Sequence, residues 1–252
     1  MHLTITSNKT LVFLILYLSL IVGFYFNENT SGGAYPDFKM RMFLIENFKN
    51  DFFYTFLNYN NYEDRHSPIL LIILSSLYKF GINLDLIRFI HLNFFILLIF
   101  ISFKCLELKF PKENKDIIFI ICCAFFLSPS LRSIAIWPDS RMLGLIVFLF
   151  SVFYFLNFKK TQKFKDCILS SALLIISSYI SPNFIIFFLY FFYFYIQILK
   201  FSKKLFIIVI INLVLSLPMI FYLFVLDVNF LTTKAIGNTD IFESLNISNK
   251  IF

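Results

Sequence analysis

The sequence contains few of the residues that usually carry catalysis or bind metals. Only three histidines occur among its 252 residues, His2, His66 and His91. The four cysteines lie in or beside apolar runs without metal-ligand spacing, so we expect free, buried thiols. The patterns GxSxG, HExxH and CxxC and a Walker phosphate loop are all missing. Short motifs therefore do not identify the chemistry of this chain.

The sequence also lacks the signature of a nucleic-acid-binding protein. Its formal net charge is +7, but no basic patch interleaved with exposed aromatic residues lies in a soluble segment. It has no internal repeat of fixed period and no low-complexity linker. We therefore expect one domain, residues 1–252, that does not bind nucleic acid.

What dominates the sequence is apolar residues. They make up 59% of the chain, and the mean hydropathy is +0.81. Several apolar runs approach or exceed about 20 residues, the length that spans a bilayer as a helix. This composition predicts an all-α polytopic membrane protein with about seven transmembrane helices, over 11–26, 86–103, 117–131, 142–158, 167–180, 183–199 and 205–226.

Lysines set the expected orientation of these helices. Three connections are rich in lysine, 104–116, 158–166 and 200–204, and such connections collect on the cytoplasmic side. The N-terminus is then cytoplasmic, whereas residues 27–85 and the tail 227–252 lie outside. We expect an integral protein of a bacterial inner (plasma) membrane.

The first external loop, residues 27–85, has a pattern of its own. Large apolar residues recur at near-helical spacing between charged residues, which predicts amphipathic helices on the membrane surface; they are Phe38, Met42, Ile45, Phe48 and Phe52. The apolar run 68–80 has only 13 residues and fits a re-entrant or interfacial helix.

Charged residues beside the apolar runs are the candidates for chemistry, because polar groups next to a bilayer are costly. One cluster is Asp37 with Glu63, Asp64, Arg65 and His66, and the other is Arg132, Asp139 and Arg141. The predicted topology brings both to one face of the membrane. Their carboxylates could accept a proton or hold a divalent metal, and their arginines could bind a phosphate.

Each candidate also has a structural interpretation. Arg132 and Arg141 could reach toward lipid headgroups, and Trp137 could anchor the chain at the membrane interface. Residues 63–65 could form a solvated turn, and His66 could cap the short helix after it. Asp37 could be the N-cap of the amphipathic helix.

The order of these features resembles the membrane-embedded GT-C glycosyltransferases, the group of protein O-mannosyltransferase-like (glycosyltransferase family 39-like) and aminoarabinose-transferase-like enzymes. The likeness covers roughly residues 10–230. An outward span leads into an external loop with an early acid, Asp37 in SGGAYPDF, and the loop ends in Arg65-His66-Ser67-Pro68. A later connection carries Ser128-Pro129, Arg132 and Asp139.

The resemblance implies transfer of a sugar from a polyprenyl-phosphate donor to a lipid, glycan or protein acceptor on the extracytoplasmic face. It makes Asp37 the general base or a metal ligand, with Asp64 or Asp139 as the second acid. Arg132, Arg141, Arg65 and His66 would then face the lipid phosphate.

The resemblance has limits that leave other functions open. Members of the family are commonly longer, so this chain could be a minimal, a truncated or an inactive relative. The alternative function is a non-enzymatic membrane protein, such as a lipid-linked saccharide transporter or an accessory subunit.

Overall fold

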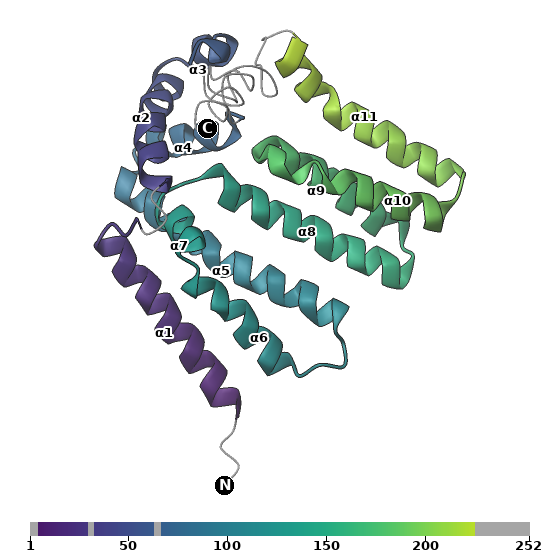
Figure 1. Cartoon of the computed structure of the whole chain (residues 1–252). Helices are drawn as coiled ribbons and strands as arrows, with labels where there is room; N and C mark the ends of the chain where they lie inside the picture. Colours follow the sequence, from purple (N-terminus) through teal and green to yellow (C-terminus); the bar gives the residue numbers. More distant parts are fainter. Residues whose placement is uncertain (1–4, 30–32, 63–66, 225–252) are drawn as a thin grey trace, which may run out of the picture.

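The computed structural model of the chain describes residues 5–29, 33–62 and 67–224, and no strand occurs among them. The described part is all-α, as the sequence predicts (Figure 1). Short 3-10 turns, η1 to η3, interrupt the α-helices. In chain order the elements are α1 (Ile5–Tyr25), α2 (Ala34–Asn50), α3 (Phe52–Leu57), η1 (Tyr59–Tyr62), α4 (Ile69–Lys79), α5 (Leu84–Lys109), α6 (Lys115–Cys123), η2 (Ala124–Leu127), α7 (Pro129–Ile136), α8 (Ser140–Thr161), α9 (Phe164–Ile180), η3 (Pro182–Phe184), α10 (Phe187–Leu199) and α11 (Lys203–Phe224).

The long helices form a fan, and the short helices of the first loop gather at one end of it. Figure 1 shows α2 near α7, α4 beside α2 and the start of α5, and α3 beyond α2 at the tip of this end. The connections α5–α6, α8–α9 and α10–α11 lie along the opposite edge of the fan. These are the three lysine-rich connections, so the structure places them on the same side.

Within the described residues, three stretches are long and apolar enough to cross a membrane, α5, α8 and residues 182–199. The pair formed by 115–127 and 129–136 would make a fourth, but it is bent by 71°. The apolar part of α1 within the described residues, Lys9–Tyr25, and α4 are shorter than this limit. The structure thus contains helices where the seven spans were predicted, but it does not confirm that all seven cross.

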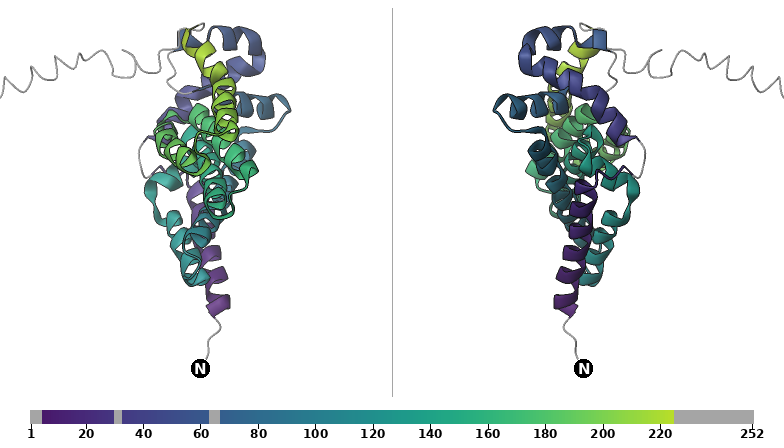
Figure 2. Two further views of the ribbon diagram at one scale, coloured as in Figure 1. Left: turned by 90° about the vertical axis from the view of Figure 1, so that its right-hand side faces the viewer. Right: turned by 90° about the vertical axis from the view of Figure 1, so that its left-hand side faces the viewer.

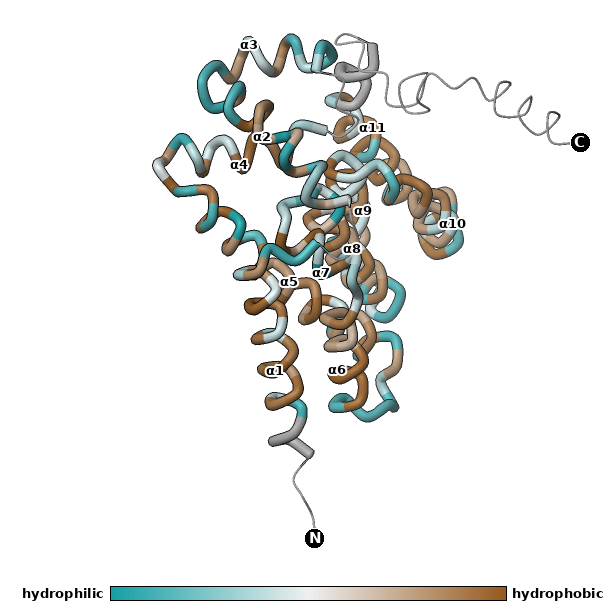
Figure 3. The backbone as a smooth tube through the Cα atoms, turned by 60° about the vertical axis from the view of Figure 1, so that its left-hand side comes forward, coloured by the Kyte–Doolittle hydropathy of each residue, from teal (hydrophilic) through white to brown (hydrophobic). Residues whose placement is uncertain are grey.

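The apolar residues are distributed as expected for helices surrounded by lipid. Many large side chains of α1, α10 and α11 are exposed, for example Leu18, Leu189 and Leu213, each more than half accessible. Figure 3 shows these apolar helices in brown and the polar connection between α5 and α6 in teal. Exposed apolar surface of this extent is unusual for a protein surrounded by water. This surface indicates a membrane protein.

Two buried clusters hold the fan together. The first joins α1, α2 and α4 to α5, α6, α7 and the start of α8, and it includes Leu92, Phe95 and Phe126. The second joins the end of α8 to α9, α10 and α11 around Phe155 and Phe191. Because α8 contributes to both clusters, it is the element that connects the two halves of the molecule.

The helices α8 and α9 meet through small side chains. The hydroxyl of Ser151 donates to the carbonyl O of Ser170 at 2.8 Å, and the hydroxyl of Ser170 donates back to Ser151 O at 3.0 Å. Gly144 lies where α8 meets η3, and a Cβ on it would be 2.8 Å from the Cβ of Ser181. Small residues of this kind allow close helix approach in a bilayer.

The predicted amphipathic helices of the first loop are present as α2 and α3. Phe38, Ile45 and Phe48 are buried as their spacing predicts, whereas Phe52 stays 38% exposed. The buried face of α2 packs against α4 within the protein, so α2 is covered there by a helix of its own chain rather than by lipid. The two side views of Figure 2 show α2, α3 and α4 grouped at the end of the molecule away from the N-terminus.

Candidate functional site

The connection from α6 to α8 is shaped by caps and prolines. The side chain of Ser128 accepts from the backbone N of Leu131 and begins α7, with Pro129 at its first position. Trp137 is extended, as the residue before a proline usually is. Asp139 then caps α8, because its Oδ1 accepts from the backbone N of Arg141 at 2.7 Å. These local signals place Asp139 and Arg141 beside α2.

Arg141 is the centre of a charged cluster that joins both predicted groups. Its guanidinium donates to Asp139 through Nε at 2.9 Å and through Nη2 at 2.8 Å. The same Nη2 lies 3.6 Å from Oδ2 of Asp37 on α2. The structure therefore brings Asp37, Asp139 and Arg141 together, three residues that the sequence had placed on one face. We call these three, with Arg41, the charged cluster.

The members of the charged cluster differ in exposure. The Asp139 side chain is 1% exposed, whereas those of Asp37 and Arg141 are 37% and 43% exposed. Nη1 of Arg41, four residues after Asp37 on α2, lies 3.9 Å from Oδ2 of Asp139. Asp139 is thus the buried support of the cluster, and Asp37 and Arg141 form the edge that a ligand can reach.

Burial alone raises the pKa of Asp139, because it disfavours the charged carboxylate. The hydrogen bonds and positive charge of Arg141, together with the charge of Arg41, outweigh burial and hold the pKa of Asp139 below its usual value. Asp139 is therefore ionised at neutral pH and serves as the counterion of two arginines rather than as a proton acceptor.

Asp37 lies in the first turn of α2, where a negative charge is favoured by the helix dipole. The interpretation of Asp37 as the N-cap is wrong, since the N-cap is Gly33. The carboxylate of Asp37 does not cap the helix and instead points toward Arg141.

Arg132 has a different environment from Arg141. Its Nε donates to Oε1 of Glu28 at 2.7 Å, and its other nitrogens contact the hydroxyl and carbonyl of Ser19 and the carbonyl of Phe126. Gly23 makes room for this pair, because a Cβ there would lie 2.1 Å from Oε2 of Glu28. These contacts fasten α7 to the end of α1. Headgroup contact and phosphate binding by Arg132 stay predictions.

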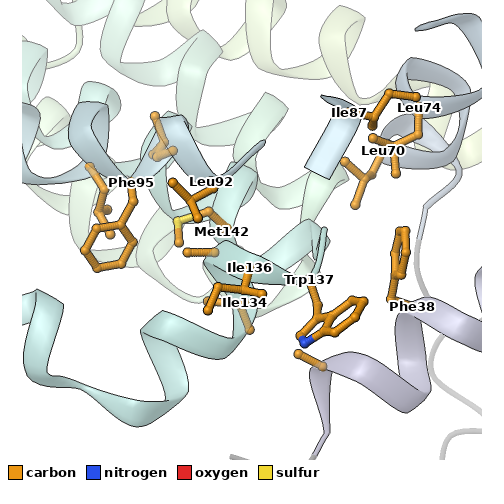
Figure 4. Packing of buried hydrophobic residues seen from close by; sticks show 14 of the residues in the cluster. Phe38, Leu70, Leu74, Ile87, Leu92, Phe95, Ile134, Ile136, Trp137 and Met142 are labelled. Carbon is orange, nitrogen blue, oxygen red and sulfur yellow. The ribbon is translucent and has the colours of Figure 1, made fainter. Parts of the chain in front are cut away.

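Trp137 is buried, 6% exposed, so the prediction of an interfacial anchor is wrong. Its Nε1 donates to the carbonyl O of Glu28 at 3.0 Å. Its ring centroid lies 4.6 Å from that of Tyr35, and the guanidinium carbon of Arg88 lies 3.8 Å from it. Figure 4 shows Trp137 facing Phe38 within the buried cluster. The indole thus joins α2 and α5 at the end of α7, two residues before Asp139.

His91 supports the same region from α5. Its Nε2 lies 3.1 Å from the carbonyl O of Ile134 and 3.4 Å from the backbone N of Asp139. His91 is thus a packed, hydrogen-bonded residue, 2% exposed.

The remaining predicted residues, Arg65 and His66 with Glu63 and Asp64, lie outside the described residues, as does the predicted tail. No group of three or more His, Cys, Asp or Glu side chains suited to a metal occurs in the described ranges. Asp37 and Asp139, one of the predicted metal pairs, both contact Arg141. A divalent ion between these carboxylates would have to displace that guanidinium.

Sequence reasoning missed three residues of this region, Glu28, Arg41 and Arg88. A signal existed for Arg41, because its spacing of four residues from Asp37 puts both on one face of a helix. No local pattern predicts the pair of Glu28 with Arg132, which are 104 residues apart.

Comparison with known proteins adds no name to this geometry: no protein-family model, no curated protein and no solved structure matches the chain.

Proposed function

We propose that the chain is a membrane-embedded glycosyltransferase that moves a sugar from a polyprenyl-phosphate donor to an acceptor hydroxyl. The observation that carries the proposal is the open edge of the charged cluster, where the carboxylate of Asp37 lies 3.6 Å from the guanidinium of Arg141. A carboxylate beside an accessible arginine provides the two groups that the transfer requires.

The chemistry assigns one role to each group. Asp37 accepts the proton of the acceptor hydroxyl, whose oxygen bonds to the anomeric carbon of the sugar. The bond from that carbon to the phosphate oxygen breaks, and the polyprenyl phosphate leaves with the electron pair. Arg141 binds the phosphate and stabilises its growing negative charge. Asp139 fixes Arg141 by two hydrogen bonds, and is a positioning residue.

The proposal includes an orientation in a bacterial inner membrane. Seven spans with a cytoplasmic N-terminus would put the charged cluster outside and the three lysine-rich connections inside. The grouping of these connections on the edge of the fan opposite α2, α3 and α4 supports this arrangement (Figure 1). In it, α4 and the α2–α3 helices form an external cap over the ends of the spans.

The test is Asp37→Asn in the full-length protein in membranes, assayed with radiolabelled polyprenyl-phosphate hexoses. Removing a general base lowers transfer by about 10²- to 10⁴-fold. The matched control is Glu46→Gln, which neutralises an exposed carboxylate on the same helix and should leave transfer unchanged. Undiminished transfer by Asp37→Asn would remove Asp37 as the base. A wild-type protein that transfers neither these hexoses nor pentoses from the corresponding polyprenyl-phosphate donors would contradict the function itself.

A further inference from the structure

A cavity lies between α9, η3, α10 and α11, far along the chain from the charged cluster. Its volume is about 390 Å³. Apolar side chains make up most of its wall, among them Leu174, Ile185, Phe188, Phe192, Val209 and Leu213. No charged side chain lines it among the residues that the structure describes. Such a wall excludes a phosphate or a sugar and favours a hydrocarbon body.

Most polar groups in the wall already have partners inside the protein. The hydroxyl of Ser178 donates to Leu174 O at 2.9 Å, and that of Ser216 donates to Asn212 O at 2.7 Å. The hydroxyl of Tyr179 donates to the carbonyl O of Leu215. These hydroxyl protons are therefore not available to a ligand.

Asn212 is the exception. Its residue is 6% exposed, and its Oδ1 accepts from the hydroxyl of Ser171 at 2.6 Å. Its Nδ2 is buried and has no hydrogen-bond partner. A buried amide N–H without a hydrogen-bond partner is unfavourable, and the interior of a bilayer has no water to serve as that partner. Asn212 lines the cavity, and a turn of its enclosed amide would bring this donor within reach of an acceptor there.

We propose that this cavity binds a lipid-like molecule whose apolar body carries one carbonyl oxygen, which accepts a hydrogen bond from Nδ2 of Asn212. The ligand class follows from the wall, which offers one donor and otherwise hydrocarbon contact. A fatty acyl ester and a long-chain quinone share this chemistry. The site does not depend on the proposed sugar transfer, since none of its residues belongs to the charged cluster.

The experiment uses the full-length protein in lipid nanodiscs with two probe classes, an ester and a quinone, and the ester is used both with its photoreactive label and unlabelled as a competitor. The first is the methyl ester of a fatty acid that carries a photoactivatable diazirine in its chain, and the second is an unlabelled decyl-substituted benzoquinone as competitor. Illumination should attach the ester probe to residues of α9, α10 and α11 that line the cavity. Competition by unlabelled methyl ester alone identifies an acyl ester as the ligand class, and stronger competition by the quinone identifies a quinone.

Two variants test the wall itself. Asn212→Leu removes the donor and should lower cavity labelling about fivefold, the effect of one hydrogen bond. Ser178→Phe fills the cavity from α9 and should lower labelling as well, which keeps the test valid if Asn212→Leu fails to fold. Ser216→Ala, whose hydroxyl is occupied within its own helix, is the matched control and should label like the wild type. Equal labelling of the wild type and both test variants would overturn the proposal.

Discussion

Arg141 contacts two carboxylates that differ in burial and in the contact that they make. Asp139 is buried and makes two hydrogen bonds to it, whereas Asp37 is partly exposed and makes one longer ion pair. The short bonds fix the guanidinium, and the longer ion pair lies at the exposed edge of the cluster. At the scale of single residues the division is therefore between a supporting acid and an accessible one.

Neutralising Asp139 should destabilise the protein, because it leaves two arginines without their buried counterion. Asp139→Asn keeps an oxygen that can cap α8 but loses the charge, and we expect a loss of about 2 to 3 kcal/mol in the free energy of unfolding. Asp51→Asn, the same change at the N-cap of α3, has no such ion pair and should cost under about 0.5 kcal/mol. Thermal unfolding of the purified variants compares the two, and equal stability would contradict the supporting role.

The lowered pKa of Asp139 has a consequence for pH. Its pKa in the unfolded chain is about 3.9. The pKa of Asp139 is lower in the folded protein than in the unfolded chain. Its contribution to folding stability is therefore present in full above the unfolded pKa and is lost as the pH falls through the folded pKa. Unfolding temperatures recorded from pH 7 down to pH 2 should therefore fall more steeply for the wild type than for Asp139→Asn. Parallel curves would argue against this contribution.

At the scale of elements, the pair of Arg132 and Glu28 fastens α7 to the end of α1. Their side chains are 13% and 17% exposed, so solvent screens the pair only in part. A double-mutant cycle with Arg132→Gln and Glu28→Gln should give a coupling energy of about 1 to 3 kcal/mol. Arg132→Lys should recover only part of the loss, since an ammonium cannot make the forked contacts of a guanidinium. A coupling energy near zero would show that the pair does not fasten these helices.

The positions of the helices could be predicted from the sequence, but several of their contacts could not. Apolar runs between lysine clusters predict α5, α8 and α9, and the 13-residue run at 68–80 becomes the short α4. The approach of Asp37 to Arg141 follows from the predicted topology. The burial of Trp137 and the engagement of Arg132 do not, because both depend on Glu28, a residue from another part of the chain. Pairing over such a separation leaves no periodic trace in a single sequence.

At the scale of the whole molecule, the proposed orientation can be tested by labelling single cysteines. The four native cysteines are buried and give little background. In intact cells, an impermeant maleimide should label Lys39→Cys, on the exposed face of α2, and should not label Lys112→Cys in the α5–α6 connection. Labelling of Lys112→Cys after the membrane is opened shows that the site is reactive. Labelling of Lys112→Cys in intact cells would show that the α5–α6 connection lies outside, which contradicts the proposed orientation.

Trp137 is the only tryptophan in the chain, and it lies where α2, α5 and α7 meet. Indole emission moves to longer wavelength when the ring enters water, so the tryptophan fluorescence of this protein, excited apart from that of its tyrosines, reports on one junction alone. A movement of α2 away from α7 that exposes Trp137 during binding or denaturation is therefore detectable without an added dye. The molecule thus contains its own fluorescent probe two residues before Asp139 of the charged cluster.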